Sequence, residues 1–213
     1  MILEIIPAIL VKTRGELLHK IGLVKDHVNI IQLDIMDGEF VPNKTIGLEE
    51  LHDLPEAKYE FHWMVNHPEK YIEKMPGPNM HLVHVETLTD IAAVEAAVEK
   101  AGGKLGLALN PETPLEKLLP FASKAEEVLV MTVHPGFSGQ KYIQEMEEKM
   151  RKLRELYPQL NIEVDGGIGL ETIGRAYAAG ANYLAAASAI FSTDNIKENV
   201  ENLRKAALSG CPS

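Results

Sequence analysis

The sequence predicts an α/β protein with the (β/α)8 fold, the TIM barrel, in which eight parallel strands alternate with helices. Eight short apolar segments recur along the 213 residues, and segments with helical periodicity lie between them. The strand–helix pairs recur about every 27 residues, which suits a compact ring. An open, doubly wound sheet is the alternative, but it usually has fewer strands and a Gly-rich turn after the first. Pro7-Ala8 stands there instead, so we favour the barrel.

Each expected element follows from its own pattern. The expected strands are short runs rich in aliphatic and β-branched residues, at 3–10, 29–35, 59–65, 81–86, 104–110, 127–133, 161–165 and 182–187. The expected helices, with apolar residues at i, i+3 and i+4, cover 14–26, 89–102, 113–122, 141–156, 170–180 and 193–208, with weaker stretches near 47–52 and 68–74. No linker or low-complexity tract divides residues 1–213, so we expect a single barrel domain.

Composition excludes some classes of partner. The formal net charge is -10 and the pI is about 5.3, which disfavours binding to nucleic acid or an anionic membrane through the overall field. The single cysteine, Cys211, permits no intrachain disulfide. MILEIIPAIL carries Glu4 and lacks the features of a signal peptide, and no apolar run is long enough for a membrane span. We therefore expect a soluble cytoplasmic protein.

Polar residues gather at the expected carboxyl ends of the strands, where barrel enzymes have their active sites. Asp34 and Asp165 each follow apolar strand residues, on strands 2 and 7. A buried acid is costly unless it is paired or binds a metal. Two carboxylates on opposite sides of a pocket suit general acid–base catalysis at one carbon. The alternative is that each caps a turn, which we prefer for Asp37 in Asp37-Gly38.

His62 joins the two aspartates as a possible metal ligand. Imidazole with two carboxylates suits Mn²⁺, Fe²⁺, Co²⁺ or Zn²⁺. A lone strand histidine is more often a hydrogen-bonded core residue, so the prediction depends on the two acids. Trp63 follows His62 and should point the other way, into the packing between barrel and helices.

Three candidate anion-binding loops follow neighbouring strands 6, 7 and 8, and the first two contain glycines. Glycine lets backbone N–H groups approach an anion, and barrels frequently bind phosphate after strands 7 and 8. The candidate phosphate residues are Gly136, Gly139, Gly166, Gly167 and Ser188. Met36, Met64 and Met131 also fall at strand ends, either lining the pocket or filling core gaps.

These residues resemble the ribulose-phosphate 3-epimerase family over nearly the whole chain. The matching stretches are PAIL (7–10), LDIMDGEFVPN (33–43), FHWMV (61–65), VHVE (83–86), LALNPETPLE (107–116), VLVMTVHPGFSGQKYI (128–143), EVDGG (163–167) and ASAIF (187–191). The resemblance implies an isomerase of carbohydrate metabolism, in the pentose phosphate pathway, that interconverts D-ribulose 5-phosphate and D-xylulose 5-phosphate. It also implies a homo-oligomer.

The resemblance gives the site residues roles. Asp34 and Asp165 match the aspartates that exchange protons at C3, and His62 matches a histidine that holds a divalent metal with them. The same match puts Met36, Met64 and Met131 in the substrate pocket and the five loop residues in the phosphate site.

Four positions depart from the family pattern: Ala8 replaces a serine, Gln32 the first metal histidine, and Ser138 and Ala187 glycines. Gln32 can still offer a carbonyl oxygen, which Mg²⁺ or Mn²⁺ tolerates better than Zn²⁺ or Fe²⁺ does. Two alternatives therefore stay open: an epimerase of another ketose phosphate, such as a hexulose 6-phosphate, and a non-catalytic sugar-phosphate-binding protein.

Overall fold

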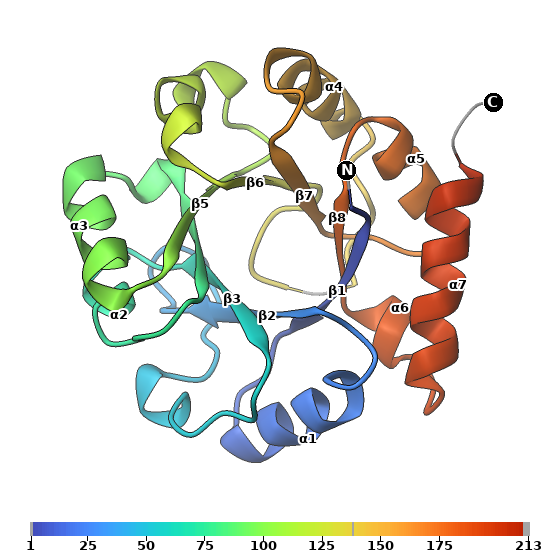
Figure 1. Cartoon of the computed structure of the whole chain (residues 1–213), viewed down its shortest axis with the longest axis horizontal. Helices are drawn as coiled ribbons and strands as arrows, with labels where there is room; N and C mark the ends of the chain where they lie inside the picture. The colour runs from blue at the N-terminus through green and yellow to red at the C-terminus, as the bar shows by residue number, and fades with distance from the viewer. Residues whose placement is uncertain (1, 138, 211–213) are drawn as a thin grey trace.

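The chain folds into a closed ring of eight parallel strands in a computed structural model that describes residues 2–137 and 139–210 (Figure 1). Each strand pairs with the next in the sequence, and β8 closes the ring on β1. The strands are β1 (Glu4–Ile9), β2 (Ile30–Met36), β3 (Lys58–Met64), β4 (Met80–His84), β5 (Lys104–Leu109), β6 (Glu127–Met131), β7 (Asn161–Asp165) and β8 (Tyr183–Ala186). All eight overlap the expected segments, which confirms the barrel. Ser138 and Cys211 lie outside the described residues.

Helices surround the ring, as Figure 1 shows. The α-helices are α1 (Arg14–Val24), α2 (Glu69–Ile72), α3 (Ile91–Ala101), α4 (Met146–Leu156), α5 (Ile173–Ala178), α6 (Ser188–Phe191) and α7 (Ile196–Ser209). Short 3-10 helices are η1 (Leu48–Glu50), η2 (Val85–Thr87), η3 (Leu115–Lys117) and η4 (Leu119–Lys124). Within the described residues, every helix is too short or too polar to span a bilayer.

Two helix predictions were wrong in extent. Residues 113–122 form η3 and η4 rather than one α-helix. Pro120 lies at the start of η4 and has no N–H to donate, which disfavours a continuous α-helix there. Helix α4 begins at Met146 rather than at 141, because the preceding segment pairs with the barrel: the Ile143 N–H donates to the Thr132 carbonyl at 2.8 Å.

The apolar core lies mainly between the strands and the surrounding helices. Helix α1 buries Leu17 and Ile21, which are four residues apart and so share a helix face. Trp63 is fully buried in this layer, stacks on Phe61 with ring centroids 5.3 Å apart, and donates from Nε1 to His81 Nδ1 at 3.1 Å. The expected packing role of Trp63 is confirmed.

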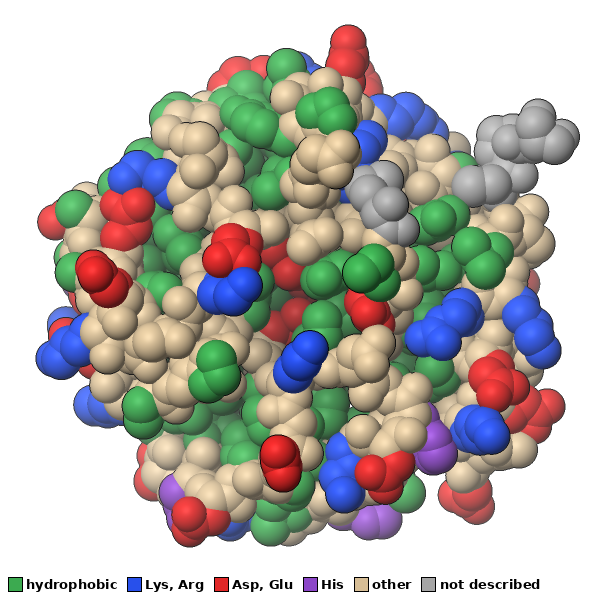
Figure 2. All heavy atoms as spheres, viewed as in Figure 1, with side chains coloured by type: hydrophobic (Ala, Val, Ile, Leu, Met, Phe, Trp, Pro, Cys, Tyr) green, Lys and Arg blue, Asp and Glu red, His purple; other side chains and the backbone are tan. Residues whose placement is uncertain are grey.

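Strand register sets which polar side chains meet inside the barrel. Side chains two residues apart on a strand share a face, so Gln32 and Asp34 point the same way from β2. Asp34 pairs in register with His62 on β3, and Asp165 ends β7 across the ring. The carboxyl ends of the strands therefore bring these groups to one end of the barrel. On the face drawn in Figure 2, acidic and basic side chains are interspersed around the rim.

Candidate active site

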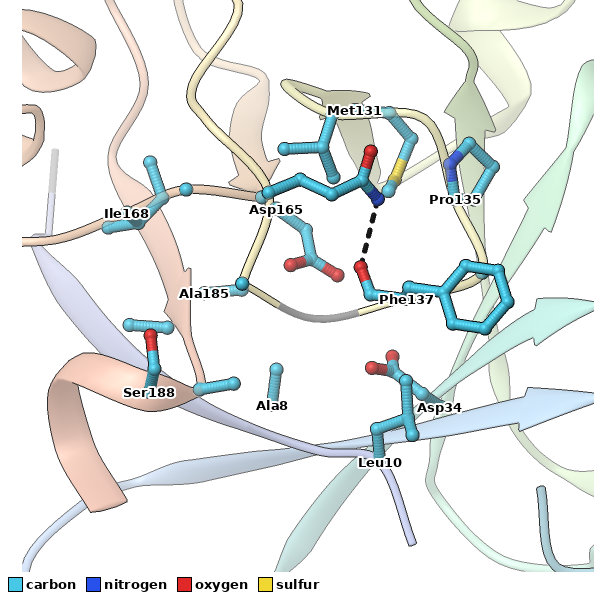
Figure 3. A pocket seen from close by; sticks show the side chains of 18 of the residues that line it. Ala8, Leu10, Asp34, Met131, Pro135, Phe137, Asp165, Ile168, Ala185 and Ser188 are labelled. Atoms are coloured by element: carbon cyan, nitrogen blue, oxygen red, sulfur yellow. Dashed lines mark hydrogen bonds between the residues drawn. The ribbon is translucent and has the colours of Figure 1, made fainter. Parts of the chain in front are cut away.

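A cavity of about 440 Å³ opens at the carboxyl ends of the strands. Figure 3 shows the carboxylates of Asp34 and Asp165 facing into it, with Ala8 and Ser188 on the neighbouring wall. Its lining includes most of the predicted site residues: Asp34, Met36, Met64, Met131, Gly136, Gly139, Asp165, Gly166, Gly167 and Ser188. His62 and Gln32 are fully buried and lie outside this lining.

The Gln32 side chain bridges the two aspartates. Its Nε2 donates to Asp34 Oδ1 at 2.7 Å and to Asp165 Oδ2 at 2.7 Å. An amide nitrogen has two hydrogens, so these two bonds use both. The amide thus fixes both carboxylates relative to each other, a role that the sequence did not predict. The Gln32 oxygen Oε1 is buried without a hydrogen-bond partner among the described residues.

His62 lies beside the same two carboxylates. Its Nδ1 is 3.1 Å from Asp34 Oδ1 and 3.6 Å from Asp165 Oδ2. Burial opposes a positive charge on His62, but the two aspartates outweigh it and raise the histidine pKa to about 9. Burial raises the pKa of Asp34, and the hydrogen bond from His62 partly offsets that effect.

Three of the four predicted metal ligands have suitable donor atoms in place. One atom each from Asp34, His62 and Asp165 lies within 4.8 Å of the others, so the set could hold a divalent cation. Gln32 is oriented differently from our expectation, because it presents N–H groups to this centre, and an N–H group cannot coordinate a cation. Its unpartnered Oε1 is the atom that a cation would require.

The loop after β7 needs glycine for close packing. A Cβ on Gly166 would lie 2.4 Å from Val133 Cγ2, and one on Gly167 would lie 2.5 Å from the Tyr142 backbone nitrogen. Both residues also have positive φ, 119° and 66°. No Lys or Arg occurs among the described residues that line the cavity, so an anion there would have to bind to backbone N–H and hydroxyl groups.

Two loops meet above the cavity. Asn43 Nδ2, from the loop after β2, donates to the Gly136 carbonyl at 2.6 Å. Gln140 Nε2 donates to the His134 carbonyl at 2.6 Å and to the Phe137 carbonyl at 2.9 Å, the second of which Figure 3 draws. Phe137 is 56% exposed beside the opening.

Asp37 holds the turn after β2, as predicted. Its Oδ1 accepts from the N–H groups of Glu39 at 2.8 Å and Phe40 at 2.9 Å, and its Oδ2 accepts from the Asn66 N–H at 2.7 Å. The three methionines named in the sequence analysis line the cavity, with Met64 and Met131 buried by at least 98%. Ala8 and Ala187, two of the departures from the family pattern, add small apolar side chains to one wall.

Sequence reasoning missed two groups of polar residues near the barrel axis. The first group is His84 and Glu86, which lie behind His62. His62 Nε2 is 2.9 Å from His84 Nε2, and His84 Nδ1 is 3.2 Å from Glu86 Oε2. These residues were recognised only as polar strand ends.

The second group is a glutamate cluster, formed by Glu60, Glu127 and Glu163, whose carboxylate oxygens lie within 4.8 Å of one another inside the barrel. Glu60 and Glu163 stand two residues before His62 and Asp165 on the same strands, which is the signal that places them on the inner face.

Comparisons with known proteins show the family to which this chain belongs. A model of the Ribulose-phosphate 3 epimerase family matches residues 4–191. The ribulose-phosphate 3-epimerase of Schizosaccharomyces pombe is 36% identical over 96% of this chain and 94% of that protein. A ribulose-phosphate 3-epimerase cytoplasmic isoform of Oryza sativa subsp. japonica is 42% identical over 82% of this chain and 81% of that protein.

Solved structures show the same fold at low sequence identity. A 3-keto-L-gulonate-6-phosphate decarboxylase from Vibrio cholerae superposes with a TM-score of 0.75 and 13% identity, covering 100% of both chains. A 3-hexulose-6-phosphate synthase from Salmonella typhimurium gives a TM-score of 0.70 and 16% identity, covering 97% of this chain and 99% of that chain. At these identities the likeness concerns the barrel alone.

Proposed function

This chain belongs to the ribulose-phosphate 3-epimerase family, and we propose that it interconverts D-ribulose 5-phosphate and D-xylulose 5-phosphate by proton transfer at C3. It is accordingly an isomerase that acts on a carbohydrate phosphate. The observation that carries the proposal is the pair of carboxylates, Asp34 and Asp165, that face one cavity from β2 and β7.

The two aspartates divide the work of epimerisation. Inversion at a carbon requires that a base remove a proton from one face and that an acid return one to the other. Asp34 and Asp165 come from β2 and β7, which β1 and β8 separate in the ring, so the two carboxylates would approach a sugar carbon in the cavity from different sides. For the reverse reaction the two residues exchange roles. The Gln32 amide, bonded to both at 2.7 Å, holds the carboxylates in place for either direction.

A divalent cation fits the same centre. Asp34, His62 and Asp165 would hold it, since their donor atoms lie within 4.8 Å of one another. When bound, it would supply a positive charge that stabilises the enediolate oxygens formed after C3 loses its proton. Gln32 would contribute its Oε1 only after a half-turn of the amide, which would end the two bonds to the aspartates.

The phosphate would bind at the glycine loop after β7 and at Ser188. Gly166 and Gly167 bring the backbone close to the cavity because a side chain at either position would collide with Val133 or Tyr142. Binding through neutral N–H groups suits a chain whose net charge is -10, because it requires no basic patch.

The proposal is tested by proton NMR of ribulose 5-phosphate in deuterated buffer, with added Mg²⁺ or Zn²⁺ or with EDTA. The expected result is deuterium at C3 together with xylulose 5-phosphate. Asp34→Asn and Asp165→Asn should each lower the rate at least about a hundredfold, in the range for loss of a general acid or base. Asp26→Asn is the matched control, because Asp26 is exposed and, within the part of the chain that the structure describes, forms an ion pair only with its neighbour Lys25.

Either aspartate variant retaining full activity would overturn the two-aspartate mechanism. If the wild-type protein exchanges no deuterium under any of these conditions, the pentulose phosphate is the wrong substrate, and a panel of ketose phosphates decides what replaces it.

A hexulose 6-phosphate is the second candidate substrate, and one observation favours it. Ala8, Ala185 and Ala187 line one side of the cavity with methyl groups, which offer space but no hydrogen bond to a hydroxyl. A substrate panel separates the candidates by kcat/KM. Binding of several sugar phosphates without turnover would indicate instead a non-catalytic binding protein.

A further inference from the structure

A chain of hydrogen bonds leads from the buried His62 ring, on the side opposite the aspartates, to Glu86. His62 Nε2 lies 2.9 Å from His84 Nε2, and His84 Nδ1 lies 3.2 Å from Glu86 Oε2. The other Glu86 oxygen, Oε1, accepts from the Asn110 backbone N–H at 2.8 Å. None of these three outer residues is used in the proton transfer described above.

With a neutral His84, only one placement of the hydrogens satisfies every contact in this series of hydrogen bonds. The Asn110 N–H donates to Glu86, and a carboxylate can only accept, so His84 Nδ1 must carry a hydrogen. A neutral His84 then has a bare Nε2. The contact of 2.9 Å between the two Nε2 atoms needs one hydrogen, which must therefore belong to His62.

The electrostatics of the chain agree with this arrangement. The His84 side chain is fully buried and its Nε2 faces the His62 ring rather than a carboxylate, so a positive charge on His84 is disfavoured. Burial opposes the charge on Glu86, but its hydrogen bond with His84 outweighs that effect and its pKa falls to about 2.

We propose that Glu86 and His84 are positioning residues, which keep a hydrogen on His62 Nε2 and thereby reserve Nδ1 for the centre shared by Asp34 and Asp165. The proposal rests on the proposed function only in taking that centre to be the reacting site. It adds a statement of which ring nitrogens of His62 and His84 carry hydrogens, and this can be measured without substrate. A ligand histidine commonly needs such a partner on its other nitrogen.

Packing excludes solvent from the two histidine rings. The side chains of His62 and His84 are fully buried, and their rings stack with centroids 5.1 Å apart. The Phe40 ring packs against the His84 ring, with centroids 4.9 Å apart. The Thr87 hydroxyl donates to the His84 carbonyl at 3.0 Å and fixes the backbone beneath the ring. Water is therefore kept from the contact between the two rings, although 20% of the Glu86 side chain at the outer end is exposed.

Glu86→Gln should reverse the whole chain. The Asn110 N–H requires an acceptor, so the new amide oxygen should face it and the new NH₂ group should face His84 Nδ1. His84 would then carry its hydrogen on Nε2, and His62 Nε2 would have to be bare. The Nδ1 of His62 carries a hydrogen directed at Asp34 in either protein. In the variant it would be the only hydrogen on the ring, so Nδ1 could not release it to make room for a cation.

The experiment is ¹⁵N NMR of the histidine rings in the full-length protein without substrate or metal, followed by Mn²⁺ titration. In the wild-type protein without metal, His84 should be protonated on Nδ1 alone and His62 on Nε2 as well as on the Nδ1 that faces Asp34. In Glu86→Gln, His84 should be protonated on Nε2, and Mn²⁺ affinity should fall 10- to 100-fold, as for loss of comparable partners. Thermal unfolding of both proteins verifies that the variant is folded.

Glu112→Gln is the matched control. It also removes one negative charge from the loop end of the barrel, but Glu112 is 66% exposed in its side chain and pairs with His134 at 2.8 Å, away from the chain of bonds. It should leave both tautomers and Mn²⁺ affinity unchanged. A wild-type His84 protonated on Nε2, or a Glu86→Gln protein that binds Mn²⁺ as tightly as wild type, overturns the proposal. Failure of epimerisation alone changes neither readout.

Discussion

Replacement of Glu127 by Gln should stabilise the barrel at high pH and not at low pH. Glu127 is 1% exposed and shares the interior of the barrel with Glu60 and Glu163. Its Oε1 has no hydrogen-bond partner among the described residues. A carboxylate there loses hydration without gaining a cation, so the neutral acid is favoured. Gln has nearly the same shape as the neutral acid and cannot ionise.

The magnitude follows from the pKa of Glu127, which burial raises from 4.5 to about 7. In the folded state the group binds its proton more tightly than in the unfolded state. Stability is therefore undisturbed below pH 4.5, falls as pH rises towards 7, and is lowest above 7. At about 1.4 kcal/mol for each pH unit between the two values, wild type should lose about 3 kcal/mol relative to Glu127→Gln between pH 4.5 and pH 8.

The assay is urea unfolding of both proteins at pH 4.5 and pH 8, followed by circular dichroism and by the fluorescence of the single tryptophan, Trp63. Coincident curves from the two probes establish a two-state transition. Glu126→Gln is the control. Glu126 is adjacent in sequence, but its side chain is 55% exposed and pairs with Lys104 at the surface. A stability difference between Glu127→Gln and wild type that is the same at both pH values refutes the reasoning.

Three further predictions concern the site and its support. Gln32→Glu replaces the bridging N–H groups with a third carboxylate, so Mn²⁺ affinity measured by calorimetry should rise at least about tenfold; an unchanged affinity contradicts this reading of Gln32. Gly167→Ala places a Cβ 2.5 Å from the Tyr142 nitrogen at a φ of 66°, so steady-state kinetics should show a KM for the sugar phosphate raised at least about tenfold. Trp63→Phe leaves His81 Nδ1 buried without its donor, which should cost about 1–3 kcal/mol in urea unfolding by circular dichroism; full stability would show that the bond contributes nothing.

The sequence predicted the fold because each of the eight strands is a short apolar run that can be recognised by itself. Each apolar run is bounded by turn residues, and parallel pairing of successive runs leaves a closed ring as the simplest arrangement. The failure at 113–122 has a local cause. The apolar spacing there is typical of a helix, but Pro120 has no N–H group to donate to an α-helical hydrogen bond. Only the structure shows that two 3-10 helices form instead.

The residues of the candidate site that lie at the carboxyl ends of strands could be predicted from the sequence. Asp34 and Asp165 could be paired because the carboxyl ends of all strands of a barrel meet at one face. The cavity lining includes all but two of the predicted catalytic, metal-binding, phosphate-binding and pocket residues, and the exceptions, His62 and Gln32, lie buried beside it.

Side-chain orientation was decided only by the tertiary structure. The sequence shows a glutamine at position 32, but the two carboxylates on different strands determine which end of its amide faces the centre. In the same way, the hydrogen on His62 depends on His84 and Glu86, which β4 and the turn after it bring against β3. The sequence by itself determined which groups reach the end of the barrel. Hydrogen-bond direction is a property of several strands together, and it exists only once the ring has closed.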